Sequence, residues 1–279
     1  MFPLTVASDM TILYLYSELG NYNFPIFREL VVLYEAHVHV VYWEPHNSRP
    51  LQRPAIDQVH YYSRSSLNEQ TIYELALSVK PDIVYVAGWM DKGYLPTARK
   101  LKIMGIPVVI GFDDQWRGTL RQWVGSIYFR THLKRYYSHA WVAGPRQYEF
   151  ARRLGFKRRN IVFCLLSCDN TVWEAAGARL FQKALAYPSS FLFAGKLLPY
   201  KGVDILAKAF AKYRDEYHGK WKLICVGSGD LRHLITNQPN VETYDFMDPV
   251  GLVKLFEKSG VFVLPSRLDQ WGVVVHEAA

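Results

Sequence analysis

Two lysines and two glycines stand where a predicted strand passes into a predicted helix, in residues 193–202 (FAGKLLPYKG). Gly195 lets the backbone turn closely at the strand end. Lys196 and Lys201 place two ammonium groups beside the amino end of the helix, where unpaired N–H groups and the helix dipole also favour anions. The segment therefore suits a diphosphate, and a solvated turn with exposed lysines fits the same string equally well.

Two carboxylates eight residues apart, Asp269 and Glu277, flank a glycine-led helix start in residues 264–279 (LPSRLDQWGVVVHEAA). Because this segment follows a buried strand, both side chains are expected at the carboxyl end of a sheet, where acidic groups accept hydrogen bonds from sugar hydroxyls. Asp269 as a helix N-cap and Glu277 as a surface residue is the structural alternative.

A third glycine turn, residues 226–230 (VGSGD), directly follows a predicted strand and contributes Gly227 and Gly229. It lacks the full G-x-G-x-x-G pattern of dinucleotide-binding proteins. By itself it predicts only a close approach of the backbone to a neighbouring group.

The order of the three segments, over about 85 residues, resembles the donor half of a GT-B glycosyltransferase of family 4 (glycosyl transferases group 1). The pattern is G-[RK]-x4-K-G, then V-G-x-G, then E-x7-E with Asp269 in its first acidic position and Glu277 in its second. The resemblance covers residues 191–279 and extends to the first half only as architecture.

The resemblance assigns a role to each position. Lys196 and Lys201, with Gly195, would hold the donor diphosphate; Lys196 replaces the more frequent arginine and so offers a point charge instead of a planar fork. Glu277 would hold the ribose hydroxyls, and Asp269, one methylene shorter than glutamate, would lie near the transferred sugar. Gly227 and Gly229 belong to the same donor site. The implied reaction retains the sugar configuration and needs neither metal nor cofactor besides the sugar nucleotide.

In the first half, Asp113 and Asp114 follow the strand expected at residues 108–110, and either carboxylate suits an acceptor hydroxyl. We assign the candidate acceptor-side catalytic role to Asp113. A pair of N-cap residues for the following helix is the alternative of equal weight.

Residues 117–159 carry eleven lysines and arginines against one acid, Glu149, a surplus larger than the formal charge of +8 for the whole chain. Aromatic residues are interleaved with these cations. Three interpretations fit: a solvated basic face over core aromatics, an anionic membrane surface or lipid-linked acceptor, and single-stranded nucleic acid. Because the second half resembles a donor domain, we favour a membrane surface over nucleic acid as the partner of these residues.

Short apolar runs alternate with longer amphipathic stretches, which predicts parallel βαβ units. The first series has expected strands at residues 12–16, 38–43, 83–86, 108–110, 140–142 and 161–163, and helices at residues 25–34, 69–78, 91–104 and 120–137. The second has strands at residues 191–194, 222–226, 241–244 and 261–264, and helices at residues 203–213, 250–258 and from 271. We therefore expect an α/β chain of two Rossmann-like domains of GT-B type.

The boundary is expected within residues 167–188, giving an acceptor-side domain over residues 1–168 and a donor domain over residues 169–279. A length of 279 residues, against about 350 to 400 in the resembled family, predicts that the second domain is incomplete.

Three cysteines in no zinc spacing are too few for a disulfide framework, which predicts a reducing compartment. Residues 1–11 include Asp9 and no basic n-region, so no signal peptide is expected. The longest apolar runs fall far short of a bilayer-spanning length. The expected location is cytoplasmic, with peripheral attachment to the inner face of a membrane where residues 117–159 bind one.

The function expected from these observations is transfer of a hexose from a nucleoside diphosphate sugar to a hydroxyl acceptor, either a glycan or a lipid-linked molecule. An inactive, incomplete glycosyltransferase and a basic nucleic-acid-binding protein with a Rossmann-like core are the alternatives.

Overall fold

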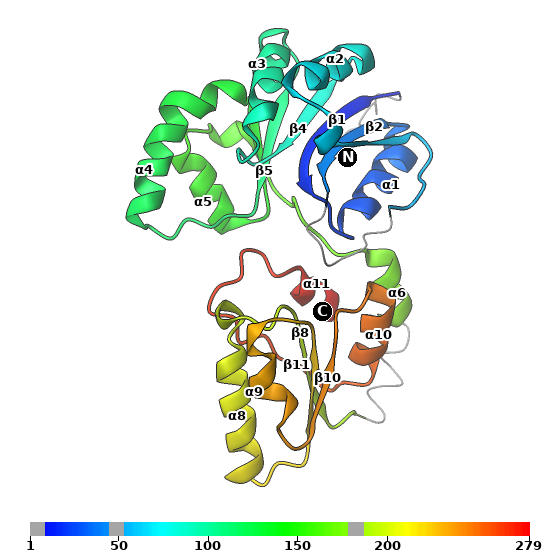
Figure 1. Cartoon of the computed structure of the whole chain (residues 1–279), viewed down its shortest axis with the longest axis vertical. Helices are drawn as coiled ribbons and strands as arrows, with labels where there is room; N and C mark the ends of the chain where they lie inside the picture. The colour runs from blue at the N-terminus through cyan, green and yellow to red at the C-terminus, as the bar shows by residue number, and fades with distance from the viewer. Residues whose placement is uncertain (1–8, 45–52, 178–186) are drawn as a thin grey trace. The chain divides into compact units, whose positions relative to one another are not determined.

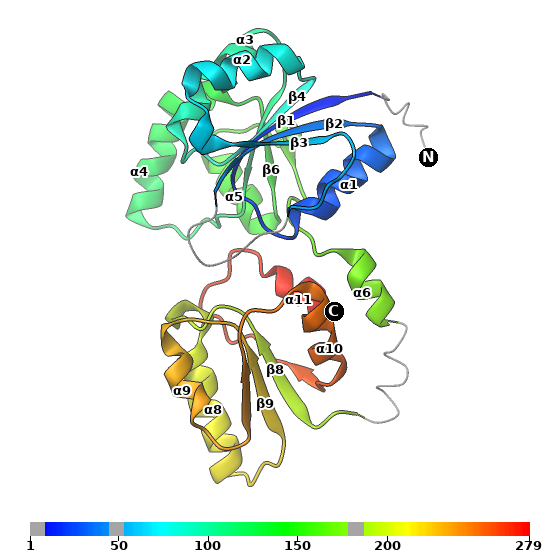
Figure 2. The same ribbon diagram turned by 45° about the vertical axis from the view of Figure 1, so that its right-hand side comes forward.

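The computed structural model describes residues 9–44, 53–177 and 187–279. The chain forms two compact units that divide between Ser167 and Cys168, and each unit is a parallel sheet covered by helices (Figures 1 and 2). This confirms the α/β class. Residues 1–8, where no signal peptide is expected, and residues 178–186 of the expected boundary interval lie outside the described residues.

The first unit contains a seven-stranded sheet of order β3-β2-β1-β4-β5-β6-β7, and every neighbouring pair is parallel. Its strands are β1 (Thr11–Glu18), β2 (His37–Trp43), β3 (Val59–Ser63), β4 (Ile83–Ala87), β5 (Val108–Phe112), β6 (His139–Val142) and β7 (Ile161–Val162). Its helices are α1 (Asn23–Tyr34), α2 (Glu69–Val79), α3 (Leu95–Ile103), α4 (Leu120–Tyr128) and α5 (Pro145–Arg153).

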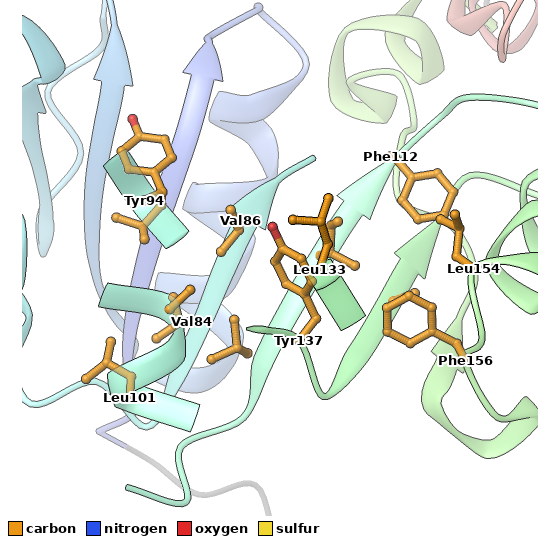
Figure 3. Close-up of a cluster of buried hydrophobic side chains, with 14 of the residues drawn as sticks. Val84, Val86, Tyr94, Leu101, Phe112, Leu133, Tyr137, Leu154 and Phe156 are labelled. Atoms are coloured by element: carbon orange, nitrogen blue, oxygen red, sulfur yellow. The ribbon is translucent and has the colours of Figure 1, made fainter. Parts of the chain in front are cut away.

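Alternate residues of these strands feed two separate cores, because successive side chains point to opposite faces of a sheet. Leu13 and Val84 lie in the core that receives α2, α3 and α5, whereas Tyr14 and Tyr85 lie in the core that receives α1. Figure 3 shows the first of these cores, in which Tyr137 packs among aliphatic and aromatic side chains from β4, β5 and the helices.

The second unit contains a four-stranded sheet of order β10-β9-β8-β11, again parallel throughout. Its strands are β8 (Ser190–Ala194), β9 (Lys222–Val226), β10 (Val241–Tyr244) and β11 (Val261–Phe262). Its helices are α6 (Asn170–Gly177), α8 (Val203–Asp215), α9 (His233–Thr236), α10 (Pro249–Glu257) and α11 (Val273–Ala278). Helices α8 and α9 cover one face of the sheet and α10 the other (Figure 2).

Several elements differ from the sequence-based expectation. Strand β3 and helix α5 were not expected from the pattern, and the single helix predicted over residues 120–137 is wrong. The α-helical part ends at Tyr128 and continues as a π turn over Phe129–Leu133 and a 3-10 turn over Lys134–Tyr136. The wider π turn places both Phe129 and Leu133 in the core.

Within the described ranges, no helix is both long and apolar enough to cross a membrane.

Candidate functional site

The loops that follow β8, β9 and β11 lie along one edge of the second sheet, because parallel strands all end on the same side. These loops contain each of the three segments singled out by their sequence. The segments begin at residues 193, 226 and 264, which are far apart along the chain. They come together because of the strand order, in which β8 lies between β9 and β11.

The β8 and β9 loops are held together by backbone hydrogen bonds. The Gly195 amide donates to the Val226 carbonyl at 2.9 Å, and the Leu197 amide donates to the Ser228 carbonyl at 2.9 Å. Gly227 has a φ of +135°, and a Cβ there would lie 2.0 Å from the Gly195 carbonyl oxygen. Glycine is therefore required at position 227 by both conformation and space.

We expect Gly227→Ala to lower the free energy of unfolding by about 2 kcal/mol or more, because strain and overpacking act together. Urea denaturation followed by circular dichroism measures this change. Gly118→Ala is the matched control, since Gly118 also has a positive φ, +69°, but no atom within 4 Å of the added Cβ. Equal losses in the two variants would contradict the packing argument.

Lys201 and Asp269 form an ion pair across two loops, with the Lys201 Nζ 2.5 Å from the Asp269 Oδ2. Both side chains are largely buried, and the Ser266 hydroxyl donates to the same carboxylate oxygen at 3.3 Å. The pair joins the start of α8 to the loop after β11. Asp269 is therefore not a helix N-cap, because α11 is preceded by Gly272 in the left-handed conformation.

A second ion pair joins the start of α8 to the loop after β11. The Arg267 guanidinium donates from both terminal nitrogens to the Asp204 carboxylate, each at 2.6 Å, and lowers the pKa of Asp204 to about 2. Gly202 completes the contact, since a Cβ there would lie 2.0 Å from the Pro265 carbonyl oxygen. The Lys201–Asp269 pair thus sits on a rigid backbone junction.

Lys196 lies on the exposed side of the β8 loop. Among the described residues its ammonium group makes no ion pair or hydrogen bond, in contrast to Lys201. The edge therefore combines one cation fixed against a carboxylate with one cation that faces solvent.

Glu277 lies on α11 and is partly buried. Burial raises the pKa of its carboxyl above the usual range, and within the described residues no hydrogen bond or opposite charge contacts it. The pKa of the Cys168 thiol is raised mainly by burial, and the charges of the Glu277 and Asp169 carboxylates raise it further. An isolated, partly desolvated carboxylate is a costly arrangement for the folded chain.

In the first unit, Asp113 and Asp114 follow β5 at the corresponding edge of the larger sheet. They are not N-cap residues, because the N-cap of α4 is Thr119, whose hydroxyl accepts from the Gln122 amide. The pKa of Asp114 is raised by partial desolvation, against the opposing effect of Arg117 and Arg121.

Tyr22 is a neighbour of Asp113 that sequence reasoning missed. Its pKa is raised by burial, and the charges of Asp113 and Glu18 add to this effect. The carboxylate and the phenol come from segments about 90 residues apart, so no local signal in the sequence links them. The ion pair between Arg267 and Asp204 was also missed, because these two residues are far apart along the chain.

Within the part of the chain that the structure describes, no group of three or more His, Cys, Asp or Glu side chains is arranged to hold a metal ion.

Residues 188–279 match the sequence model of a family described as glycosyl transferases group 1. An uncharacterized glycosyltransferase of Methanocaldococcus jannaschii is 31% identical over 94 residues, which are 31% of this chain and 24% of that protein. The match thus spans about a quarter of the curated relative's length. These findings confirm the resemblance that the three sequence segments indicated.

Solved structures extend the likeness to both units. HepE of Anabaena, in complex with UDP, has a TM-score of 0.67 at 15% identity, with 96% of this chain and 78% of that chain covered. An E. coli structure described as trehalose-6-phosphate bound with UDP-2-fluoro glucose has a TM-score of 0.65 at 14% identity, covering 96% and 81%. At these identities the likeness shows the fold, which is of GT-B type with two Rossmann-like units.

Proposed function

We propose that this chain, a GT-B fold whose residues 188–279 match glycosyl transferases group 1, transfers a hexose from a nucleoside diphosphate sugar to a hydroxyl acceptor. The acceptor is a glycan or a lipid-linked molecule. The transfer retains the configuration of the sugar and uses no metal ion. The second unit holds the donor, and the first unit holds the acceptor.

The observation that carries this proposal is the meeting of Lys201 and Asp269 at the edge of the second sheet. They are 68 residues apart in the chain and occupy the second basic and first acidic positions of the motifs. The two charged groups are 2.5 Å apart, and close glycine contacts fix the loops that carry them. The cation is thus preorganised for the phosphate side of a sugar phosphate bond, and the carboxylate for the sugar side.

Lys196 and Lys201 bind the donor diphosphate in this proposal, and Gly195, Gly227 and Gly229 let the backbone approach it closely. Glu277 accepts hydrogen bonds from the ribose hydroxyls, which explains why an unpartnered carboxylate is kept partly buried. UDP and UDP-2-fluoro glucose are bound in the structural neighbours, so we propose a uridine nucleotide as the donor.

The reaction breaks the bond between the sugar C1 and the diphosphate oxygen, and the bonding electron pair leaves with the diphosphate. The two lysines stabilise the negative charge that develops there, which is the largest electrostatic demand of the step. The acceptor oxygen bonds to C1 on the same face, and its proton passes to the departing phosphate oxygen. Asp269 holds Lys201 in place and lies beside the positively charged sugar.

Asp113 is proposed to orient the acceptor hydroxyl. Asp113→Asn removes a charged hydrogen-bond acceptor, so we expect kcat/KM for the acceptor to fall about tenfold to hundredfold, with the affinity for UDP unchanged. Initial rates at varied acceptor concentration measure the change. Asp114→Asn is the matched control, and a larger loss in that variant would transfer the role to Asp114.

The donor assignment is tested by thermal unfolding with UDP, GDP, ADP and their hexose derivatives. A ligand at about 100 times its dissociation constant adds about 2.7 kcal/mol to the stability of the folded state. We expect stabilisation by UDP and its hexose derivative, and stabilisation by GDP or ADP instead would overturn the choice of a uridine nucleotide. No stabilisation by any of them would favour an inactive glycosyltransferase, and salt-sensitive oligonucleotide binding instead would favour the nucleic-acid alternative.

A further inference from the structure

Helix α4 turns a stripe of apolar side chains toward solvent. Each of these side chains is between 50% and 80% exposed: Leu120, Trp123, Val124, Ile127 and Tyr128. Their spacing of three and four residues places them on one face of a helix with about 3.6 residues per turn. An amphipathic helix of a globular protein normally turns such a stripe inward, so this orientation needs a reason.

The helix is attached to the first unit by its other side. Ser126 is buried, and Phe129 and Leu133 of the following π turn are part of the core. Figures 1 and 2 show α4 at the margin of the first unit. The outward direction of the apolar stripe is therefore set by core packing on the opposite side, and the stripe remains uncovered over the described residues.

Cations surround the stripe. Arg117 and Arg121 stand at the start of α4, and Arg130 and Arg135 follow its end, all four exposed. Residues 115–148 contain no Asp or Glu at all. Two acids lie near this border: Asp114 interacts with Arg117 and Arg121, and Glu149 pairs with Arg153 at 2.9 Å. Positive charge is still in excess around the exposed apolar surface, which is complementary to an anionic surface.

The aromatic residues of the stripe occupy its margin. Trp123 packs edge-on against Trp116, with ring centroids 5.2 Å apart, and the Arg153 guanidinium lies 5.3 Å from the Trp123 ring centre. Tyr128 stacks on His132 at 4.7 Å. Amphipathic rings beside cations are typical of the boundary between lipid headgroups and acyl chains.

We propose that α4 docks the first unit onto an anionic lipid bilayer, with Leu120, Val124 and Ile127 inserted among the acyl chains and the arginines on the lipid phosphates. Three aliphatic side chains on one face favour a bilayer over a nucleic acid, which would meet stacked aromatic rings instead. The excess of positive charge at the border disfavours a second copy of the same face, because mostly like charges would meet.

The test is sedimentation of the full chain with vesicles of phosphatidylglycerol and phosphatidylcholine, compared with phosphatidylcholine alone. We expect binding to the anionic vesicles. The triple variant Leu120→Gln, Val124→Gln and Ile127→Gln should weaken it at least about tenfold. The control removes as much exposed apolar surface elsewhere, at Val32→Gln, Leu33→Gln and Ile103→Gln, which are 68%, 59% and 76% exposed.

The charge contribution is tested separately. Arg117→Gln with Arg121→Gln should lower the affinity for anionic vesicles about fivefold per arginine. Arg28→Gln with Arg99→Gln, two exposed arginines outside residues 117–159, should change it little. UDP stabilisation of every variant reports that the fold and the donor site are intact.

Equal vesicle binding by the apolar triple variant and its control would overturn the proposal. So would an absence of binding to the anionic vesicles, and either of two further results would then identify what covers the stripe instead. One is tight, salt-sensitive binding of a single-stranded oligonucleotide that the arginine variants abolish. The other is a concentration-dependent dimer, measured by analytical ultracentrifugation, that the apolar triple variant abolishes.

Discussion

Lys201→Ala is expected to lower kcat/KM for hexose transfer about 100-fold or more, because it removes a fixed cation from the site where diphosphate charge develops. The affinity for UDP should fall as well, since in the proposed donor site the same cation contacts the bound diphosphate. Release of UDP measures the first effect and titration calorimetry the second. Lys201→Arg keeps the charge and should recover part of both.

The matched control is Lys222→Ala, which removes a lysine of the same unit whose ammonium pairs with the Glu242 carboxylate at 2.9 Å on an exposed surface. Exposed ion pairs contribute little, so this variant should behave as the parent chain does. A partial loss of stability in Lys201→Ala is expected, because Asp269 keeps its negative charge in a largely buried place. An unchanged UDP affinity in a folded Lys201→Ala chain would refute the donor assignment.

Glu277→Gln is expected to have opposite effects on binding and stability. The affinity for UDP should fall about tenfold to hundredfold, because a carboxylate that accepts from hydroxyls is exchanged for a weaker neutral acceptor. The thermal midpoint without ligand should rise at neutral pH, because the variant no longer carries a charge in a partly desolvated place. Calorimetry and thermal unfolding measure the two effects on the same samples.

The pH dependence follows from the raised pKa of Glu277. The pKa of Glu277 in the folded chain is higher than its value of about 4.5 in the unfolded chain, so the folded chain binds the proton more tightly. At a pH above both pKa values the carboxylate is charged in both states, and its charge lowers the stability of the folded chain. The stability advantage of Glu277→Gln should therefore be present near pH 7 and vanish as pH falls below the unfolded pKa.

Donor affinity should have the opposite dependence, because in the proposed donor site only the ionised Glu277 carboxylate accepts from both ribose hydroxyls. Affinity in the parent chain should decline as pH falls through the raised pKa, and Glu277→Gln should remove this decline. If Glu277→Gln binds UDP as tightly as the parent, Glu277 is a structural residue and the ribose assignment is refuted.

The strands that carry the motifs were predictable from sequence, because short β-branched runs ending in glycine are strong local signals. Strands β8 and β9 were expected within one residue of their observed bounds. Strand β3 was missed because Val59–Ser63 mixes histidine and tyrosine at the edge of the sheet. Helix α5 was missed because arginines and other polar residues outnumber its apolar positions, and only Phe150 and Ala151 mark the buried side.

The candidate site was predictable as a set of residues and not as a set of contacts. Lys201 and Asp269 were both named for their motif positions, but their ion pair depends on β8 and β11 being neighbours. The N-cap interpretations of Asp113, Asp114 and Asp269 were wrong, because Thr119 and Gly272 occupy those cap positions. Local patterns specify which residues are suited to a cap, and backbone geometry decides which of them is used.

The sequence by itself determined the α/β class, the three donor-like segments and the positive charge of residues 117–159, because each depends on composition or short-range spacing. The tertiary structure decided which segments meet and which faces stay exposed, because both depend on strand order and on competition for the core. At the end of α4, the core positions are taken by Phe129 and Leu133 of the following π turn. Their burial leaves Leu120, Val124 and Ile127 facing outward. Amphipathic spacing alone would predict that these three side chains face the core.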